Sequence, residues 1–209
     1  MQTHPTEHAS AARRARIALS GTLRVEIGDR DVAARLPGRQ GRALFAFLVL
    51  HRHRPVSRGE LIDVLWPDVP PADPEGGLAT VLARSRSALG EGVLRGRAEL
   101  QIVLAPETEI DIERAAAAAE RSLAAGDPRS ALASAEAALE VIAQPLLPGI
   151  EGDWVDARRG ELAGLEPACS RSSPARRSSS ATASTWRSPS ASRARSPSAT
   201  RSASPAMRC

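Results

Sequence analysis

Residues 73–89 combine small and basic side chains at spacings suited to contact with nucleic acid. If this stretch is helical, one of its faces carries Ala79, Thr80, Ala83, Arg84, Arg86 and Ser87. Small side chains allow close approach to a groove, and guanidinium groups hold phosphate or read the edge of guanine. A few residues later, Arg95 and Arg97 flank a glycine. Together these residues predict a surface that contacts double-stranded DNA.

The stretch 73–89 also has the features of an amphipathic helix that could carry this surface. Asp73 can cap it, Pro74 has no N–H to lose at the first position, and Glu75 suits the positive helix end. The apolar stripe, at helical spacing, is Leu78, Val81, Leu82 and Leu89. Ser85 falls on the same stripe, where a buried hydroxyl without a partner costs about 1–3 kcal/mol.

A shorter helix is predicted just before it, over residues 57–65. Ser57 is followed three residues later by Glu60, the spacing of a capping box in which each side chain satisfies the other's backbone N–H. Apolar residues recur at helical spacing, and Trp66-Pro67 ends the helix. Two capped helices joined by a proline-rich turn have the shape of a helix-turn-helix.

The flanking sequence predicts the elements that hold these two helices. Residues 16–36 have the pattern of short strands, residues 41–51 that of a helix, and residues 93–104 that of a hairpin. The turns are predicted at Ser20-Gly21, Gly28-Asp29 and, at the hairpin tip, Arg95-Gly96-Arg97. The expected order is therefore three strands, three helices and a basic hairpin.

With this order of elements, residues 16–105 resemble the winged-helix domain of the response-regulator type found in SARP-family regulators of antibiotic pathways. The resemblance rests on Leu36-Pro37-Gly38-Arg39, Leu65-Trp66-Pro67-Asp68 and Arg84-Ser85-Arg86. The chain departs from the family at Ser85, where a leucine is usual, and at Glu99-Leu100, where Gly-Tyr is usual. The resemblance implies a recognition helix in the major groove, a homodimer on direct repeats upstream of biosynthetic genes, and recruitment of RNA polymerase.

Residues 106–166 resemble the beginning of the bacterial transcriptional activator domain, the all-helical module that follows in that family. The expected helices are Asp111 to Ala125, Asp127 to about Ala143, and one that begins near Asp153. An aspartate can cap each of the first two. The expected fold class is an α+β winged helix-turn-helix, then an all-α tetratricopeptide-like helical hairpin segment and a disordered tail.

The charge distribution separates these parts of the chain. All 28 basic residues are arginine, because the sequence contains no lysine. The net charge is +4 for residues 1–105, −8 for residues 106–166 and +8 for residues 167–209. The mildly basic residues 1–105 are suited to contact with DNA, and the acidic helical residues 106–166 are suited to contact with protein. Residues 1–15 are expected to be disordered.

The tail, residues 167–209, contains no leucine, isoleucine, valine or acidic residue, so it cannot build a core. Two interpretations stay open. The tail is a genuine arginine-serine arm that adds nonspecific affinity for nucleic acid, or the reading frame changes near residues 165–169 of a GC-rich gene. We favour the change of frame, because the composition shifts abruptly inside an expected helix that lacks its hairpin partner.

Other candidate sites are weaker. His51 and His53 do not share a helix face and are expected to be solvated, and Cys169 and Cys209 are expected to be exposed free thiols. Neither pair predicts a metal site or a disulfide.

The sequence Gly-Arg-Gln-Gly-Arg at 38–42 lacks the spacing and the lysine of a phosphate-binding loop. We expect its arginines, Arg39 and Arg42, to touch the DNA backbone instead. No arrangement of nucleophile and base, and no pair of carboxylates, stands out. The sequence therefore predicts neither an enzyme nor a cofactor.

No apolar run is long enough to cross a bilayer, and the N-terminus lacks the apolar region of a signal peptide. We therefore expect a protein of the bacterial cytoplasm, without a membrane partner. About fifteen residues precede the first predicted strand, too few for a phosphoacceptor receiver domain. Two alternatives to a transcriptional regulator remain: a protein-interaction module whose winged helix is structural, and a nonfunctional fragment of a longer regulator.

Overall fold

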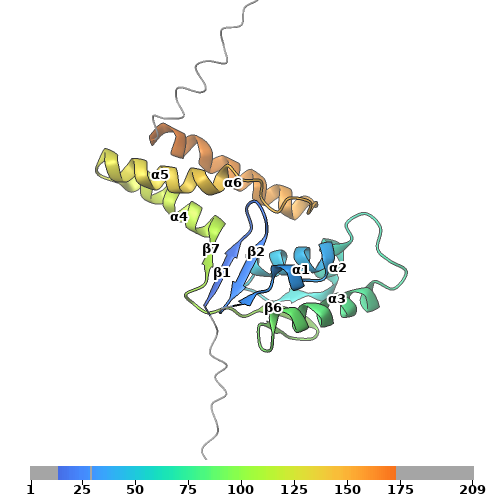
Figure 1. Ribbon diagram of the computed structural model, residues 1–209. Coiled ribbons are helices and arrows are strands. Elements are labelled where there is room, and N and C mark those ends of the chain that lie inside the picture. Colours follow the sequence, from blue (N-terminus) through green and yellow to red (C-terminus); the bar gives the residue numbers. More distant parts are fainter. Residues whose placement is uncertain (1–13, 29, 173–209) are drawn as a thin grey trace, which may run out of the picture.

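The computed structural model describes residues 14–28 and 30–172, which form a strand-rich half followed by a helical half (Figure 1). The first sheet has the order β3-β2-β1-β7. Its strands are β1 (Ala15–Ala18), β2 (Arg24–Ile27), β3 (Arg30–Asp31) and β7 (Glu109–Ile110). The neighbours β1 and β2, and β2 and β3, are antiparallel, whereas β7 lies parallel to β1. Gly21 and Gly28, both predicted in turns, have positive φ of 69° and 61°.

A short 3-10 helix, η1 (Ala33–Arg35), leads from this sheet to the three helices of the helix-turn-helix half. They are α1 (Gly38–Leu50), α2 (Arg58–Leu65) and α3 (Pro74–Leu89). The central helix is α1, in which every residue from 43 to 49 is buried. It begins three residues before the predicted start at Gly41, because the Gly41 N–H donates to the carbonyl of Pro37 at 2.8 Å and so extends the first turn.

The second sheet has the order β4-β6-β5, with β4 (Val56–Ser57), β5 (Leu94–Arg95) and β6 (Glu99–Ile102). The predicted hairpin is therefore confirmed as β5 and β6, and we call it the wing. Arg95 lies in β5, paired with Gln101, rather than at the tip as predicted. Gly96 and Arg97 remain in the turn.

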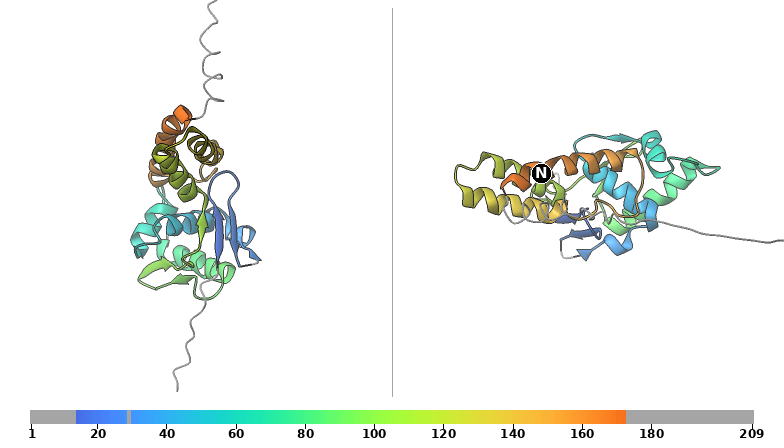
Figure 2. Two further views of the ribbon diagram at one scale, coloured as in Figure 1. Left: turned by 90° about the vertical axis from the view of Figure 1, so that its left-hand side faces the viewer. Right: turned by 90° about the horizontal axis from the view of Figure 1, so that it is seen from above.

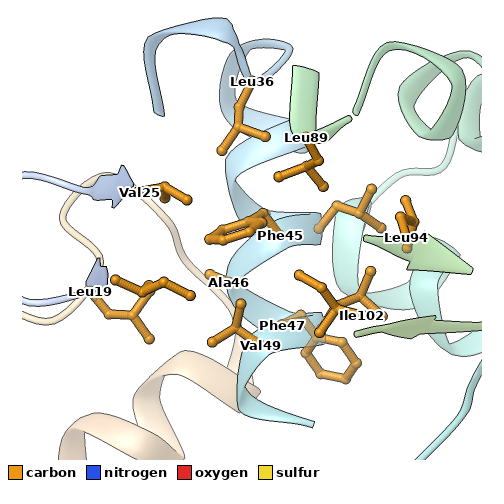
Figure 3. Packing of buried hydrophobic residues seen from close by; sticks show 14 of the residues in the cluster. Leu19, Val25, Leu36, Phe45, Ala46, Phe47, Val49, Leu89, Leu94 and Ile102 are labelled. Atoms are coloured by element: carbon orange, nitrogen blue, oxygen red, sulfur yellow. The ribbon is translucent and has the colours of Figure 1, made fainter. Parts of the chain in front are cut away.

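Figure 3 shows why α1 is buried on all sides: the first sheet packs against one side of it and the wing against the other. The side chains seen there include Leu19 and Val25, Phe45 to Phe47 and Val49 of α1, and Leu94 and Ile102 of the wing. A helix covered on several faces is apolar all round, as the run from Ala43 to Val49 is.

Three of the predicted side-chain caps are confirmed. Ser57 accepts a hydrogen bond from the Glu60 N–H at 3.2 Å, and Asp73 accepts one from the Gly76 N–H at 2.9 Å. Asp127 accepts one from the N–H of Ser130, also at 2.9 Å.

The Glu60 carboxylate of the predicted capping box has a stronger partner than the Ser57 backbone. It pairs with the guanidinium of Arg54, while the Ser57 backbone contributes less to lowering the Glu60 pKa. A guanidinium within reach offers two charge-assisted hydrogen bonds, which a single backbone N–H does not match.

The helical half consists of α4 (Asp111–Ala124), α5 (Pro128–Ile142) and α6 (Asp153–Ser172). The predicted start near Asp153 is confirmed, but α6 continues past residue 166, through Pro167, to the end of the described residues. Small side chains let the three helices approach closely around an alanine-rich cluster: Ala118, Ala119, Ala135, Ala138, Leu139 and Cys169.

Cys169 is fully buried in that cluster, so the expectation of an exposed thiol there is wrong. Burial raises the pKa of the Cys169 thiol, because the thiolate would lose its hydration. Cys209 and most of the predicted tail lie outside the described residues, as do residues 1–13.

Part of the helical half packs into the apolar core of the first half, while the alanine-rich cluster is buried separately. Ile110, Leu147 and Ile150 belong to the same buried cluster as the side chains of α1. Beside them, the ring of Phe47 meets that of Trp154 edge-on, with the ring centres 5.2 Å apart. The pairing of β7 with β1 likewise crosses the boundary that we predicted at residue 105.

Asp111 fastens this joint, and its predicted role as the cap of α4 is wrong. Residue Ile110 holds the cap position, without a side-chain hydrogen bond. The Asp111 carboxylate accepts from the N–H of Ile112 in α4 at 2.8 Å, and also from the N–H of Leu19, at 2.9 and 3.0 Å, and of Ser20, at 2.8 Å. The end of β1 presents these N–H groups after the strand pairing has stopped, so the carboxylate satisfies donors that would otherwise lack partners.

Arg159 holds the loop between α5 and α6 against the first sheet. Its guanidinium donates to the carbonyls of Leu146, Leu147 and Ile150 at 3.0 to 3.2 Å. The same loop accepts and donates backbone hydrogen bonds at the β1–β2 turn, where the Leu147 N–H reaches the Leu19 carbonyl at 2.9 Å. The helical half is therefore fixed in orientation relative to α1 and, through α1, to α3.

Candidate nucleic-acid interface

Helix α3 has one face in the core and one face in solvent. Its buried side chains are Leu78, Leu82, Ser85, Ala88 and Leu89. On the other side Ala79, Thr80, Ala83, Arg84 and Ser87 are exposed. This separation is the one predicted from the sequence, with the exception of Arg86, which is half-buried.

Ser85 is confirmed as a polar residue on the apolar side of α3. It is 1% exposed, and its hydroxyl has no hydrogen-bond partner. The helix therefore carries an unsatisfied polar group directly beneath its exposed face.

Residues of α2 and of the intervening turn fix the beginning of α3. The Nε of Arg58 donates to the Glu75 carboxylate at 2.7 Å and so joins the first turns of the two helices. The Trp66 ring lies so close to Gly77 that a β-carbon there would come within 3.2 Å of it. The sequence pattern did not predict this tie, because Arg58 and Glu75 are seventeen positions apart.

The hydroxyl of Thr80 is engaged within the helix, where it donates to the Gly76 carbonyl at 3.0 Å. Its oxygen can still accept a hydrogen bond, and its methyl group can contact a thymine methyl. Ala79, Ala83 and Ser87 add only short side chains to this face. The centre of α3 is thus smooth enough for close approach to a groove.

Of the six arginines predicted at this surface, four lie on α3 and the wing, and two of these four already have partners. The Nη2 of Arg86 donates to the carbonyl of Gly96 in the wing at 2.7 Å, and the Nε of Arg95 donates to the carbonyl of Gly92 at 3.0 Å. Arg84 and Arg97 are exposed, and neither has a hydrogen-bond or ion-pair partner within residues 14–28 and 30–172. These two guanidinium groups keep all their donors for a ligand.

The structure does not bring Arg39 and Arg42 onto the exposed face of α3. They lie at the start of α1, where they border a hollow of about 380 Å³ together with the loop of residues 147–150. The Nη2 of Arg39 is 3.5 Å from the carboxylate of Glu151. Both arginines are exposed and lie beside the joint with the helical half, apart from the exposed face of α3.

Figures 1 and 2 show that α3 and the wing lie at one end of the molecule, and that α4, α5 and α6 lie at the other. Helix α3 packs against α1 and α2. The exposed side of α3 is consequently left uncovered by the helical half, even though the two halves share a core.

His51 is engaged in the fold rather than solvated as predicted. Its Nδ1 lies 2.9 Å from the carbonyl of Phe47, and the two rings are 4.1 Å apart. Among the described residues, no three histidine, cysteine or acidic side chains are grouped so that they could hold a metal ion. None of the helices in the described ranges has the length and apolar character needed to cross a membrane.

Comparisons with known proteins agree with this architecture. No protein-family model matches the chain. The regulatory protein AfsR of Streptomyces coelicolor is 34% identical over 132 residues, which are 59% of this chain and 13% of that protein. The regulatory protein AfsR of Streptomyces griseus is 29% identical over 150 residues, which are 70% of this chain and 15% of that protein. The chain thus spans only 13 to 15% of the length of these relatives.

Among solved structures, EmbR of Mycobacterium tuberculosis, determined in complex with a low-affinity phosphopeptide, is similar with a TM-score of 0.62. The match is 24% identical and covers 76% of this chain and 44% of that one. It confirms the predicted fold class, an α+β winged helix followed by a helical segment. The similarity to the AfsR proteins confirms the predicted resemblance to SARP-type regulators.

Proposed function

We propose that this chain, a SARP-type regulator by its similarity to the AfsR proteins, binds duplex DNA sequence-specifically and regulates transcription. The observation that carries the proposal is the exposed face of α3, formed by small side chains beside the unpaired Arg84 and left uncovered by the helical half. The relatives are named regulatory proteins, and a regulatory role favours DNA binding over catalysis.

In this proposal α3 enters a major groove, with Ala79, Thr80 and Ala83 against base edges and methyl groups. Arg84 holds a phosphate or reads a guanine, and Ser87 supplies a hydroxyl at the same edge. The wing lies beside the groove, where Arg97 reaches the adjacent backbone. Arg39 and Arg42 are left out of this interface, because they border the loop of residues 147–150.

The proposal is tested by salt-dependent binding of the full chain to a duplex enriched from a randomised library. Arg84→Ala and Arg97→Ala should each weaken binding and reduce the slope of log affinity against log salt concentration by about 0.9 per lost phosphate contact. Arg121→Ala is the matched control: Arg121 is an exposed arginine of α4, so its loss changes the net charge equally but at the opposite end of the molecule.

The predicted phosphate contacts are contradicted if Arg84→Ala and Arg97→Ala keep the salt slope of the wild-type chain, as Arg121→Ala should. The proposal itself fails if the wild-type chain enriches no sequence over a randomised duplex of equal length. A base contact by Arg84 has a separate signature, since its loss should relax the preference at one position of the enriched site.

The family resemblance extends the proposal to partners. A homodimer would bind two direct repeats and activate a biosynthetic gene cluster by recruiting RNA polymerase. The helical half, which carries the acidic part of the chain, would face protein rather than DNA. Duplexes with one or two copies of the enriched site distinguish a monomer from a dimer, because only a dimer gains affinity from the second copy.

A further inference from the structure

The last turns of α3 are tied to the wing by one side chain. Arg86 is half-buried against the protein, and its Nη2 donates to the carbonyl of Gly96 at 2.7 Å. Arg84, two positions earlier on the same helix, is exposed and has no partner among the described residues. The two arginines were predicted to do the same work, but their surroundings differ.

The acceptor of this hydrogen bond lies in a turn with little room to change. Gly96 has a φ of 96°, a conformation that residues with a side chain rarely adopt. A β-carbon at this position would lie 1.8 Å from the carbonyl oxygen of Glu99 across the turn. The turn therefore fixes the direction of the Gly96 carbonyl, and the guanidinium of Arg86 on α3 donates to it.

Arg97 directly follows Gly96 and is the arginine of the wing that remains free. Its place relative to Arg84 depends on how the wing sits against α3. The ladder between β5 and β6 fixes the hairpin internally, through Leu94 with Ile102 and Arg95 with Gln101. That ladder leaves the angle between the hairpin and α3 to the contacts between them, of which the Arg86 hydrogen bond is one.

We propose that Arg86 is a positioning residue: it holds the wing against α3 so that Arg84 and Arg97 present their charges at a fixed separation, and it does not itself contact phosphate. The inference rests on the proposed function, because the separation matters only when both arginines meet one duplex. It replaces the role in contacting DNA that the sequence suggested for Arg86.

The test measures the affinity and salt slope of the full chain on the enriched duplex for Arg86→Ala, Arg84→Ala and Arg97→Ala. Arg86→Ala should weaken binding about threefold to tenfold while the salt slope stays at the wild-type value, since no phosphate contact is lost. In the Arg86→Ala background, Arg97→Ala should weaken binding less than it does in the wild type. Arg84→Ala, the matched control on the same helix, should reduce the slope and should leave the effect of Arg97→Ala unchanged.

A second variant separates geometry from charge. Gly96→Ala keeps every charge but forces the turn to rebuild, so it should reproduce the loss of affinity and the unchanged slope of Arg86→Ala. In the free protein, hydrogen exchange of the backbone amides of residues 96–99 should be faster in Arg86→Ala than in Arg84→Ala. Thermal unfolding of each variant checks that the chain remains folded.

The outcomes are distinct. A salt slope reduced by about 0.9 in Arg86→Ala would make Arg86 a phosphate contact and overturn the inference. Unchanged affinity in Arg86→Ala, or effects of Arg86→Ala and Arg97→Ala that simply add, would overturn it as well. In each of these cases the wild-type chain still binds, so the proposed function survives. If the wild-type chain enriches no duplex, the proposed function and the inference fail together.

Discussion

Three consecutive residues of α3 show how far residue type alone predicts a role. We predicted Arg84 and Arg86 on one face and Ser85 on the apolar stripe, and the structure agrees about Arg84 and Ser85. Arg86 follows the buried Leu82 by four positions, so helical spacing puts it at the border of the apolar side. The partner of Arg86 could not be predicted, because the Gly96 carbonyl is presented by a turn ten positions away. Helical spacing predicts which face a side chain occupies, whereas its hydrogen bonds depend on how distant segments pack.

Replacing Ser85 with alanine should stabilise the protein. The Ser85 hydroxyl is buried without a partner, so its removal saves a desolvation cost and raises the free energy of unfolding by about 1 kcal/mol. Urea unfolding of the full chain measures the difference. Ser87→Ala, at an exposed position of the same helix, is the control and should change the free energy by less than about 0.5 kcal/mol. A destabilised Ser85→Ala protein would mean that the hydroxyl has a partner in solution.

At the scale of elements, the helices with caps and periodic apolar residues were predictable, and the shortest strands were not. Asp73 and Asp127 cap the helices that the sequence assigns to them. The strands β4 and β7 have two residues each, too few for an alternating pattern. The bonds of Asp111 to the end of β1 could not be predicted, because those donors lie more than ninety positions earlier.

The start of α2 should lose stability in acid. The hydrogen bond from Arg54 holds the pKa of Glu60 below its ordinary value of 4.5. A lowered pKa in the folded state contributes stability that is fully present above 4.5 and is lost as the pH falls through the lowered value. Because both side chains are substantially exposed, the contribution is under about 1 kcal/mol.

Glu60→Gln removes this pH dependence. The difference in free energy of unfolding between the wild type and Glu60→Gln should therefore be greatest at neutral pH and should shrink as the pH falls below 4.5. Urea unfolding at a series of pH values measures it. Glu91→Gln, at an exposed position without an ion pair in the described ranges, is the control. A difference that does not vary with pH would contradict the role of the Arg54 hydrogen bond.

At the scale of the whole molecule, composition and charge suggested two modules, and the structure joins them through a shared part of the apolar core. The charge changes sign near residue 105, which is a property of the surface. Burial does not follow charge: Ile110 and Leu147 pack with α1, and β7 extends the first sheet. The boundary was therefore predictable as a change in surface chemistry, and the shared core was not, because it depends on side chains far apart in the sequence.

The two halves should unfold together. In a Trp186→Phe background, Trp154→Phe leaves Trp66 as the fluorophore of the helix-turn-helix half. Its fluorescence transition in urea should coincide with the loss of helical circular dichroism, to which α4, α5 and α6 contribute. Asp111→Ala should move both transitions together to a lower urea concentration, because it removes a charged acceptor from the joint. The expected loss in the free energy of unfolding is about 1.5–3 kcal/mol.

Separated fluorescence and circular dichroism transitions in the chain that retains only Trp66 would contradict a shared core. A shift of only the circular dichroism transition in Asp111→Ala would contradict the role of Asp111 as the fastening between the halves. Asp68→Ala serves as the control, since Asp68 lies exposed in the loop between α2 and α3.

If α3 binds DNA as proposed, a genetic screen for loss of binding would also find substitutions in the joint between the two halves, which lies away from the proposed DNA surface. Substitutions of Leu147, Ile150 or Arg159 would disturb the first sheet and α1, against which α3 packs. They would therefore weaken binding, as the loss of Arg84 would. Second-site suppressors of such alleles should fall on either side of the joint, in α1 as readily as in α4 or α6. A map of loss-of-function alleles would therefore be larger than the binding surface, and only in vitro affinities would separate the two.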